Sequence, residues 1–244
     1  MDGMIPVLEI FGPTIQGEGM VVGRKTMFVR TAGCDYRCTW CDSAFTWDGS
    51  AKEDIRQLSV EDVWHELKQA GGENFDHVTI SGGNPALLRH LGDLIDLLHN
   101  NGCQVALETQ GSVWQDWFLN IDDLTISPKP PSSGMETDFS KLDDILSKVE
   151  EADRTTTHTS LKVVVFDKAD FAYAEHVHQR YPQVPFYVQV GNPDPLTDEQ
   201  TNLVSGLLDD YEALVDRVVA SSAMNNVRVL PQLHVLIWGN KRGV

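Results

Sequence analysis

Three cysteines lie close together in the sequence, at Cys34, Cys38 and Cys41. Thiolates are the usual ligands of iron–sulfur clusters, and the C-x3-C-x2-C spacing lets each one bind one iron of a 4Fe–4S cluster. Three ligands leave the fourth iron open to a further ligand. A closed zinc site usually takes four ligands in two pairs, and no second CxxC occurs. The pattern therefore favours a cluster over a zinc site or three unrelated core thiols, whereas isolated Cys103 is expected in the core.

Polar or glycine-containing segments follow three apolar runs further along the chain. They are Gly82-Gly83-Asn84-Pro85, Glu108-Thr109-Gln110-Gly111 and Ser127-Pro128-Lys129-Pro130. Each alone is compatible with an ordinary loop, although paired glycines also allow a ligand to approach the backbone closely. If the preceding runs are parallel strands, their carboxyl ends share one edge with the cysteine loop. The sequence therefore predicts a single site built from all four segments.

Alternating strand-like and helix-like segments are expected to position this site. Apolar, β-branched runs predict strands at 27–30, 78–81, 104–107, 124–127, 161–166, 186–190 and 227–230. Helical periodicity predicts helices at 60–67 after the capping residue Ser59, at 87–98, at 139–149, and after a capping box of Thr197 and Gln200. This alternation predicts an α/β fold with parallel strands, in one domain over residues 1–244. Residues 130–134 are expected to be a surface loop.

Charge and hydropathy narrow the class of partner. The net charge of −17 argues against nucleic acid, because phosphate binding requires clustered Lys and Arg. The sequence shows neither a basic segment followed by an apolar one at its start nor a run long enough to span a membrane. We therefore expect a cytoplasmic protein with small-molecule partners, without nucleic acid or membrane partners.

The cysteine loop, with the aromatic Trp40 directly before Cys41, resembles that of the radical S-adenosylmethionine (SAM) superfamily. The resemblance implies a partial, modified TIM-like (βα) barrel with about six parallel strands. It also implies a 4Fe–4S cluster whose open iron binds SAM. The superfamily usually has Gly-Gly-Glu-Pro at the position of Gly82-Gly83-Asn84-Pro85, so Asn84 replaces the usual glutamate. We therefore expect a neutral amide oxygen, rather than a carboxylate, to meet the SAM ammonium.

A narrower resemblance covers essentially the whole chain. The segments 11–19, 41–43, 108–111, 127–129 and 233–234 resemble, in this order, the 7-carboxy-7-deazaguanine synthase family. The family resemblance implies a lyase that converts 6-carboxy-5,6,7,8-tetrahydropterin to 7-carboxy-7-deazaguanine with loss of ammonia, in queuosine and 7-deazapurine biosynthesis. A radical derived from SAM would take hydrogen from C6, and SAM would be regenerated. Mg²⁺, a one-electron reductant protein of flavodoxin or ferredoxin type, and a homodimer are also implied.

The same resemblance assigns roles to individual residues, with the radical carried by SAM rather than by a protein side chain. It implies SAM binding by Trp40, Asp42, Asn84, Gly111, Ser127, Pro128 and Lys129, and Mg²⁺ binding by Ser43. It implies substrate binding by Ile15, Gln16, Gly17, Arg30, Thr109 and Val244, the last through its main-chain carboxylate, with residues 1–25 as a substrate loop. Glu18 either pairs with N–H donors of the pterin or is solvated, and the role of His234 stays open.

Two other functions share the cysteine loop. An activase that forms a glycyl radical in a partner protein would need a protein-docking surface, and no additional ferredoxin-like cysteine cluster occurs. A non-catalytic iron–sulfur or zinc protein would need no SAM site. Reductive cleavage of SAM, measured with and without the pterin, distinguishes these alternatives.

Overall fold

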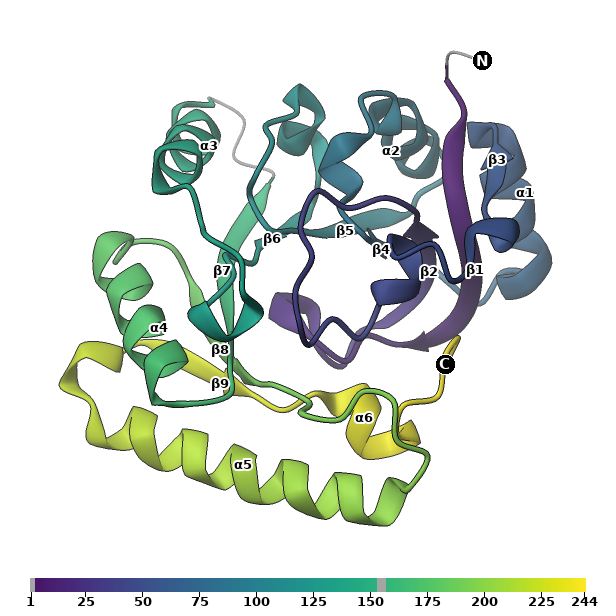
Figure 1. Ribbon diagram of the computed structural model, residues 1–244. Coiled ribbons are helices and arrows are strands. Elements are labelled where there is room, and N and C mark those ends of the chain that lie inside the picture. Colours follow the sequence, from purple (N-terminus) through teal and green to yellow (C-terminus); the bar gives the residue numbers. More distant parts are fainter. Residues whose placement is uncertain (1–2, 153–156) are drawn as a thin grey trace.

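The computed structural model describes residues 3–152 and 157–244. One nine-stranded sheet forms its centre, in the order β3-β1-β2-β4-β5-β6-β7-β8-β9 (Figure 1). Seven neighbouring strands run parallel, namely β2, β4, β5, β6, β7, β8 and β9. Strand β1 is antiparallel to both of its neighbours, β2 and β3. The sheet curves without closing, so the fold is the expected partial barrel, with seven parallel strands rather than about six. The strands are β1 (Ile5–Ile15), β2 (Lys25–Thr31), β3 (Arg56–Leu58), β4 (His77–Gly82), β5 (Gln104–Thr109), β6 (Asp123–Ile126), β7 (His158–Val165), β8 (Phe186–Val190) and β9 (Val227–Leu230).

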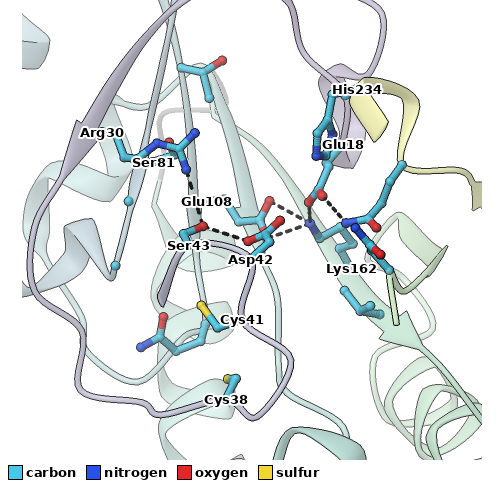
Figure 2. A pocket seen from close by; sticks show the side chains of 18 of the residues that line it. Glu18, Arg30, Cys38, Cys41, Asp42, Ser43, Ser81, Glu108, Lys162 and His234 are labelled. Atoms are coloured by element: carbon cyan, nitrogen blue, oxygen red, sulfur yellow. Dashed lines mark hydrogen bonds and ion pairs between the residues drawn. The ribbon is translucent and has the colours of Figure 1, made fainter. Parts of the chain in front are cut away.

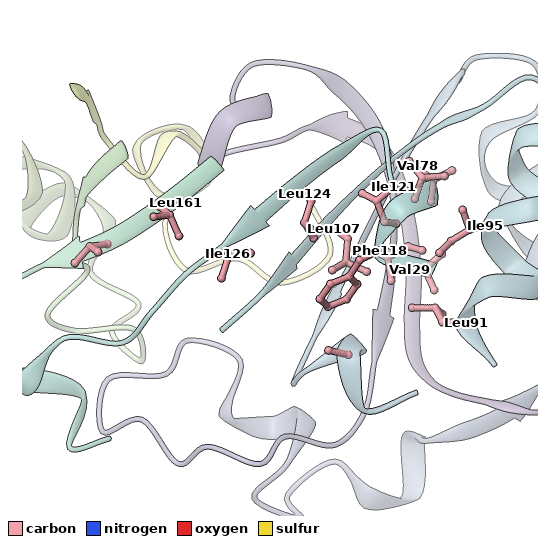
Figure 3. Packing of buried hydrophobic residues seen from close by; sticks show 14 of the residues in the cluster. Val29, Val78, Leu91, Ile95, Leu107, Phe118, Ile121, Leu124, Ile126 and Leu161 are labelled. Atoms are coloured by element: carbon pink, nitrogen blue, oxygen red, sulfur yellow. The ribbon is translucent and has the colours of Figure 1, made fainter. Parts of the chain in front are cut away.

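Helices pack against the outer face of the sheet. They are α1 (Val60–Gly71), α2 (Leu91–Asn100), α3 (Phe139–Glu151), α4 (Lys168–Arg180) and α5 (Gln200–Ala220), whereas the short α6 (Leu233–Trp238) lies beside the cavity. Outward-facing strand residues such as Val29, Leu107 and Leu124 pack with Leu91 and Ile95 of α2 into one buried cluster (Figure 3). The fold is therefore stabilised mainly by burial of apolar surface between the sheet and the helices.

The inner face of the sheet has a different composition. On β7, Leu161, Val163 and Val165 belong to the outer core, whereas Lys162 and Val164 line a cavity on the other side. Neighbouring strands alternate in the same way because successive side chains of a strand point to opposite faces. The inner face thereby carries the polar groups and the outer face carries the core.

All seven predicted strands are present, and two of the helix predictions need correction. Leu87 lies in the 3-10 turn η4 (Pro85–Leu87) and is exposed, so the second helix begins only at Leu91. The predicted capping box is wrong, because Thr197 accepts a hydrogen bond from Glu199 and α5 begins at Gln200 without a side-chain cap. Helix α4 was not predicted. The predicted cap of α1 by Ser59 is confirmed, and Asp62 completes a capping box with it.

The N-terminal segment forms a strand followed by a loop. Strand β1 occupies residues 5–15, so within the described part of the segment the predicted loop character is found mainly at residues 16–24. This loop runs beneath the sheet, where Arg24 Nη1 lies 3.4 Å from Asp123 Oδ2 and Ser160 Oγ lies 3.1 Å from Met20 Sδ. Residues 16–24, which we call the floor loop, therefore close one end of the cavity. No helix in the described part of the chain is both long and apolar enough to cross a membrane.

Candidate active site

A cavity of about 220 Å³ opens at the carboxyl ends of the parallel strands. The three clustered cysteines line it, together with residues from β2, β4, β5 and β7 (Figure 2). The floor loop and the segment after β9 supply the remaining wall. The structure thus brings segments from both halves of the chain to one site, as parallel strands require. Of the predicted residues, the cavity is lined by Ile15, Gln16, Gly17, Arg30, Cys34, Cys38, Trp40, Cys41, Asp42, Ser43, Thr109, Lys129 and Val244.

The cysteine loop is held by the segment after β6. The Thr39 backbone N–H donates to Ser133 O at 3.0 Å, and the Trp40 indole N–H donates to Ser132 Oγ at 2.9 Å. Pro131 and Gly134 are exposed, as predicted for a surface loop, whereas Pro130 and Ser133 are buried on the side of the cysteine loop. The two prolines at its start restrict the backbone and favour a fixed support.

The thiols suit a metal cluster. Burial raises the pKa values of Cys34 and Cys38, and the nearby Lys129 opposes the rise. Burial and the charge of Asp42 raise the pKa of Cys41 to about 11. Such thiols are ionised only when a cation compensates them, which iron ions supply. Three cavity-facing soft donors on one loop therefore fit a 4Fe–4S cluster with one open iron, whereas Cys103 is buried in the core as expected.

The glycine pair after β4 serves the cysteine loop. A Cβ at Gly82 would collide with the backbone of Thr31, and one at Gly83 would collide with the backbone of Gly33. The backbone N–H of Asn84 also donates to Gly33 O at 2.7 Å. The close approach that requires glycine here is therefore between two backbone segments, although both glycines also line the cavity.

Asn84 is not among the cavity-lining residues. It is 1% exposed, and its Oδ1 accepts from Thr109 Oγ1 at 2.8 Å and from the Ala86 N–H at 3.2 Å. Its Nδ2 donates to Asp35 and Ser112. The amide is fully used within the protein, so this geometry does not support the expected contact of Asn84 with SAM and indicates a role in fixing Thr109.

The other predicted SAM residues divide into two groups. Trp40, Asp42 and Lys129 line the cavity, and the Trp40 ring lies 5.1 Å from that of Phe166. Gly111, Ser127 and Pro128 are buried and are absent from the lining. Ser127 Oγ accepts from Lys129 Nζ at 3.0 Å, so it acts on the cavity through that lysine.

A group that we call the Glu9 cluster lies at the β1–β2 side of the cavity and consists of Glu9, Arg30 and Arg242. Arg30 Nε lies 2.7 Å from Glu9 Oε1, and Arg242 Nε lies 2.9 Å from Glu9 Oε2. The Arg242 guanidinium also lies 3.9 Å from the centre of the Phe45 ring. Carboxylate and ring together hold Arg30 and the C-terminal segment in place.

Ser43 connects this side with the cysteine loop. Its hydroxyl donates to Asp42 Oδ1 at 2.8 Å and accepts from Arg30 Nη1 at 3.4 Å (Figure 2). A hydroxyl and a carboxylate oxygen at this distance are donors that suit a hard cation such as Mg²⁺. The donor set fits the predicted ion.

A second ion group, which we call the Lys162 cluster, consists of Glu18, Glu108 and Lys162. Lys162 Nζ lies 2.7 Å from Glu18 Oε2 and 2.7 Å from Glu108 Oε1, and the lysine side chain is 1% exposed (Figure 2). Burial alone would raise the pKa of Glu18, but the charge of Lys162 holds it well below its usual range. Burial would lower the pKa of Lys162, whereas the two carboxylates raise it above its usual value.

The Lys162 cluster distinguishes the two alternatives for Glu18, and it contains Lys162, which was not predicted as a site residue. Glu18 is an ion-paired residue of the cavity wall, so the solvated alternative is wrong. Lys162 was overlooked within the apolar run Leu161–Phe166. A single lysine in a strand of a parallel sheet is a usable signal, because a charge buried there requires partners.

The floor loop is joined to the segment after β9. The Leu233 N–H donates to Gly17 O at 3.0 Å, and Gln232 Nε2 donates to Glu18 Oε1 at 2.8 Å. Any Cβ at Gly17 would collide with His234. His234 therefore packs against the loop and lines the cavity beside Glu18, which places it in the site.

Comparisons with known proteins agree with this geometry. The model of the radical SAM superfamily matches residues 28–161. The 7-carboxy-7-deazaguanine synthases of Bacillus cereus and Bacillus subtilis are 64% and 65% identical to the chain over 240 residues, covering 98% of it and 99% and 98% of the relatives.

A more distant relative and a solved structure extend the comparison. The 7-carboxy-7-deazaguanine synthase of Halobacterium salinarum is 30% identical, over 97% of this chain and 91% of that relative. The crystal structure of QueE from Escherichia coli has a TM-score of 0.66 at 24% identity, covers 95% of both chains and shows the shared fold. The chain belongs to the 7-carboxy-7-deazaguanine synthase family of the radical SAM superfamily.

Proposed function

We propose that the chain converts 6-carboxy-5,6,7,8-tetrahydropterin to 7-carboxy-7-deazaguanine with release of ammonia. One observation carries the proposal: the three cluster cysteines and the residues suited to a carboxylated pterin line the same cavity. The family relationship supplies the reaction, and the cavity supplies a place where cofactor and substrate meet. The product would enter the biosynthesis of queuosine or another 7-deazapurine.

Cys34, Cys38 and Cys41 would hold the 4Fe–4S cluster, and the radical SAM family relationship implies both this cluster and SAM. When bound, they supply a one-electron reaction that removes a hydrogen atom from C6 of the substrate. The chain's own residues orient the reactants. Trp40, Asp42 and Lys129 line the cavity with the three cysteines and are the proposed SAM contacts. Ser127 is proposed to act through its hydrogen bond to Lys129, and Gly111 and Pro128 through their backbone.

Two opposite sides of the cavity suit the two ends of the substrate. Arg30 presents a planar fork that pairs with a carboxylate, and the substrate has a carboxylate at C6. Across the cavity, Glu18 offers acceptor oxygens to the adjacent N3–H and 2-amino donors of the pterin ring. Ile15, Gln16, Gly17 and Thr109 would complete the binding wall with Val244, which lines the cavity at the end of the C-terminal segment.

Magnesium is proposed at Ser43, beside Asp42. Mg²⁺ retains several water molecules and takes few protein ligands, so one hydroxyl with substrate oxygens is a sufficient set. Replacing Ser43 with Ala is expected to raise the Mg²⁺ concentration needed for half-maximal turnover while iron content stays normal. A magnesium response identical to that of the parent protein would remove Ser43 from the metal site.

The radical SAM family relationship implies a one-electron reductant, and we propose a protein of the flavodoxin or ferredoxin type. We further propose that the chain is a single domain whose residues 16–24 form the substrate loop. The proposed assembly is a homodimer, which light scattering of the purified protein would test. The proposed location is the cytoplasm. Nucleic acid is not expected to bind, given the charge of −17.

The deciding experiment is anaerobic turnover of the cluster-loaded protein with SAM, Mg²⁺ and the carboxylated tetrahydropterin, followed by mass spectrometry. Formation of 7-carboxy-7-deazaguanine is expected. SAM cleavage without any pterin product would favour an activase, and the absence of SAM cleavage would favour a non-catalytic protein. Cys38→Ala should remove both the cluster absorbance and turnover, whereas Cys103→Ala, in the core, should retain both.

A further inference from the structure

We propose that Lys162 is a positioning residue for substrate recognition, which holds Glu18 in the orientation that accepts the N–H donors of the pterin ring. It also ties Glu18 to Glu108, near the carboxyl end of β5. The inference rests on the proposed substrate and adds a residue that contacts neither SAM nor the reacting atoms.

The first argument concerns where the charge of Lys162 goes. Its ammonium group lies 2.7 Å from Glu18 and 2.7 Å from Glu108, so two of its three hydrogens point to carboxylates. The side chain is 1% exposed. Its neighbour on the same strand face, Val164, lines the same cavity. Lys162 therefore supplies a fixed cation inside the wall rather than a contact to solvent.

The second argument concerns the freedom of Glu18. Glycines flank it on both sides, at Gly17 and Gly19, and its side chain caps no helix. Its two carboxylate oxygens are each held by one partner, Oε2 by Lys162 and Oε1 by Gln232. Without the lysine, the neutral amide of Gln232 would be the one remaining side-chain hydrogen-bond partner of this carboxylate among the described residues, with His234 nearby. Lys162 is thus the main restraint on the direction of this carboxylate.

The third argument concerns charge. With both glutamates ionised, the cluster carries a net charge of −1 and presents acceptors to the cavity. A buried ion group of this kind seldom adds stability beyond what apolar residues would give, so its composition calls for another explanation. Recognition of a ligand edge that carries several N–H donors is such an explanation, because charged acceptors strengthen these hydrogen bonds. The cluster should therefore favour a 2-amino-4-oxo ring over an analogue with oxygen at position 2.

The test compares Lys162→Met, Lys162→Arg and the double variant Lys162→Met/Glu108→Gln with the parent protein. The double variant restores the net charge of −1 without the lysine, which keeps the test valid if the single Met variant fails to fold. Lys148→Met is the matched control, because Lys148 forms an exposed pair with Asp144 at 2.7 Å on α3. Substrate and SAM dissociation constants, steady-state KM and kcat, iron content and melting temperature are measured for each.

In the double variant we expect the substrate dissociation constant and KM to rise about tenfold or more. SAM affinity, iron content and kcat should change less than about twofold, and melting temperature should stay near the parental value. Lys162→Arg should recover part of the substrate affinity, because it keeps a donor cation between the carboxylates. Preference for the 2-amino ring over its 2-oxo analogue should fall with Lys162→Met and remain with Lys148→Met.

Two results would overturn the inference. One is a double variant with parental substrate affinity, and the other is an equal loss of substrate and SAM affinity. If the parent protein does not convert the pterin, the proposed function is wrong, and the role of Lys162 that rests on it is wrong as well. If the parent converts it and the double variant binds it equally well, only the role of Lys162 is wrong.

Discussion

The two ion clusters on either side of the cavity have opposite compositions. In the Glu9 cluster one carboxylate lies between two guanidinium groups, whereas in the Lys162 cluster one ammonium lies between two carboxylates. Counting these side chains alone, the first carries +1 and the second −1. A ligand with a carboxylate at one end and N–H donors at the other has one favourable orientation between them. The two clusters would therefore orient the proposed substrate by polarity.

The clusters also differ in their exposure to solvent. Lys162 is 1% exposed, whereas Arg242 is 41% exposed. Exposed ion pairs contribute little because water and salt screen them, while removing one partner of a buried group leaves an unpaired charge. Substitutions in the Lys162 cluster should consequently have larger effects than substitutions at the outer edge of the Glu9 cluster.

The largest effect is expected for Glu18→Gln, which keeps the size of the side chain and removes its charge. Loss of a charged acceptor should weaken substrate binding by about 3 kcal/mol, which raises KM roughly a hundredfold. Steady-state kinetics and substrate titration measure the change, with Glu73→Gln, at a 92% exposed position, as the control. A KM equal to that of the parent protein would show that the Lys162 cluster does not contribute to substrate binding through Glu18.

Arg30→Lys is expected to have the next largest effect. It keeps the positive charge but loses the bidentate fork, and should weaken substrate binding by about 1–3 kcal/mol. SAM affinity, measured by titration, should hardly change. Equal losses of substrate and SAM affinity would mean that Arg30 is structural.

Glu9→Gln tests the centre of the positive side. The guanidinium of Arg30 would lose its anionic partner and become less well oriented, so we expect KM to rise by about 1 kcal/mol, or roughly fivefold. Because Glu9 lies behind Arg30, kcat at saturating substrate should remain near the parental value. A fall in kcat at unchanged KM would contradict an orienting role.

The smallest effect is expected for Arg242→Ala, which removes an exposed ion pair. Such pairs contribute about 0–1 kcal/mol, so KM should rise no more than about fivefold. Arg180→Ala is a close control, because Arg180 is 40% exposed and pairs with Asp143 in the same way, away from the cavity. A hundredfold loss at Arg242 would show that both clusters contribute equally.

Much of the fold was predictable because its strands have distinct composition. The parallel strands are buried on both faces, so they form β-branched runs that stand out in the sequence. Strand β1 was missed because it contains Pro6 and Gly12-Pro13 and pairs with β2 through irregular register. Helix α4 was missed because its apolar residues Phe171, Tyr173, Ala174 and Val177 form only a weak stripe among polar ones.

The site was predictable where a motif keeps its ligands within a few residues. The cysteine loop is such a motif, and all three thiols face the cavity. Residues that pair through the tertiary fold could not be matched to their partners from the sequence. Lys162 and Glu18 are separated by 144 residues, and their pairing depends on the register of β7 and the path of the floor loop. Asn84 is the opposite case, because its motif predicted a contact with SAM. In the structure, its side chain instead accepts a hydrogen bond from Thr109.

The hydrogen bond from Leu233 to Gly17 joins residues near opposite ends of the sequence. During synthesis on a ribosome, the floor loop emerges early and must wait for almost the whole chain before this partner exists. Contacts of such long range form late, since the entropy of closing the intervening chain is lost before they form. The sheet can gather its strands in order as they emerge, but the wall that holds Glu18 beside Gln232 closes only after residues 232 and 233 have emerged. Binding competence should therefore appear after most of the secondary structure, which stalled chains of increasing length would reveal.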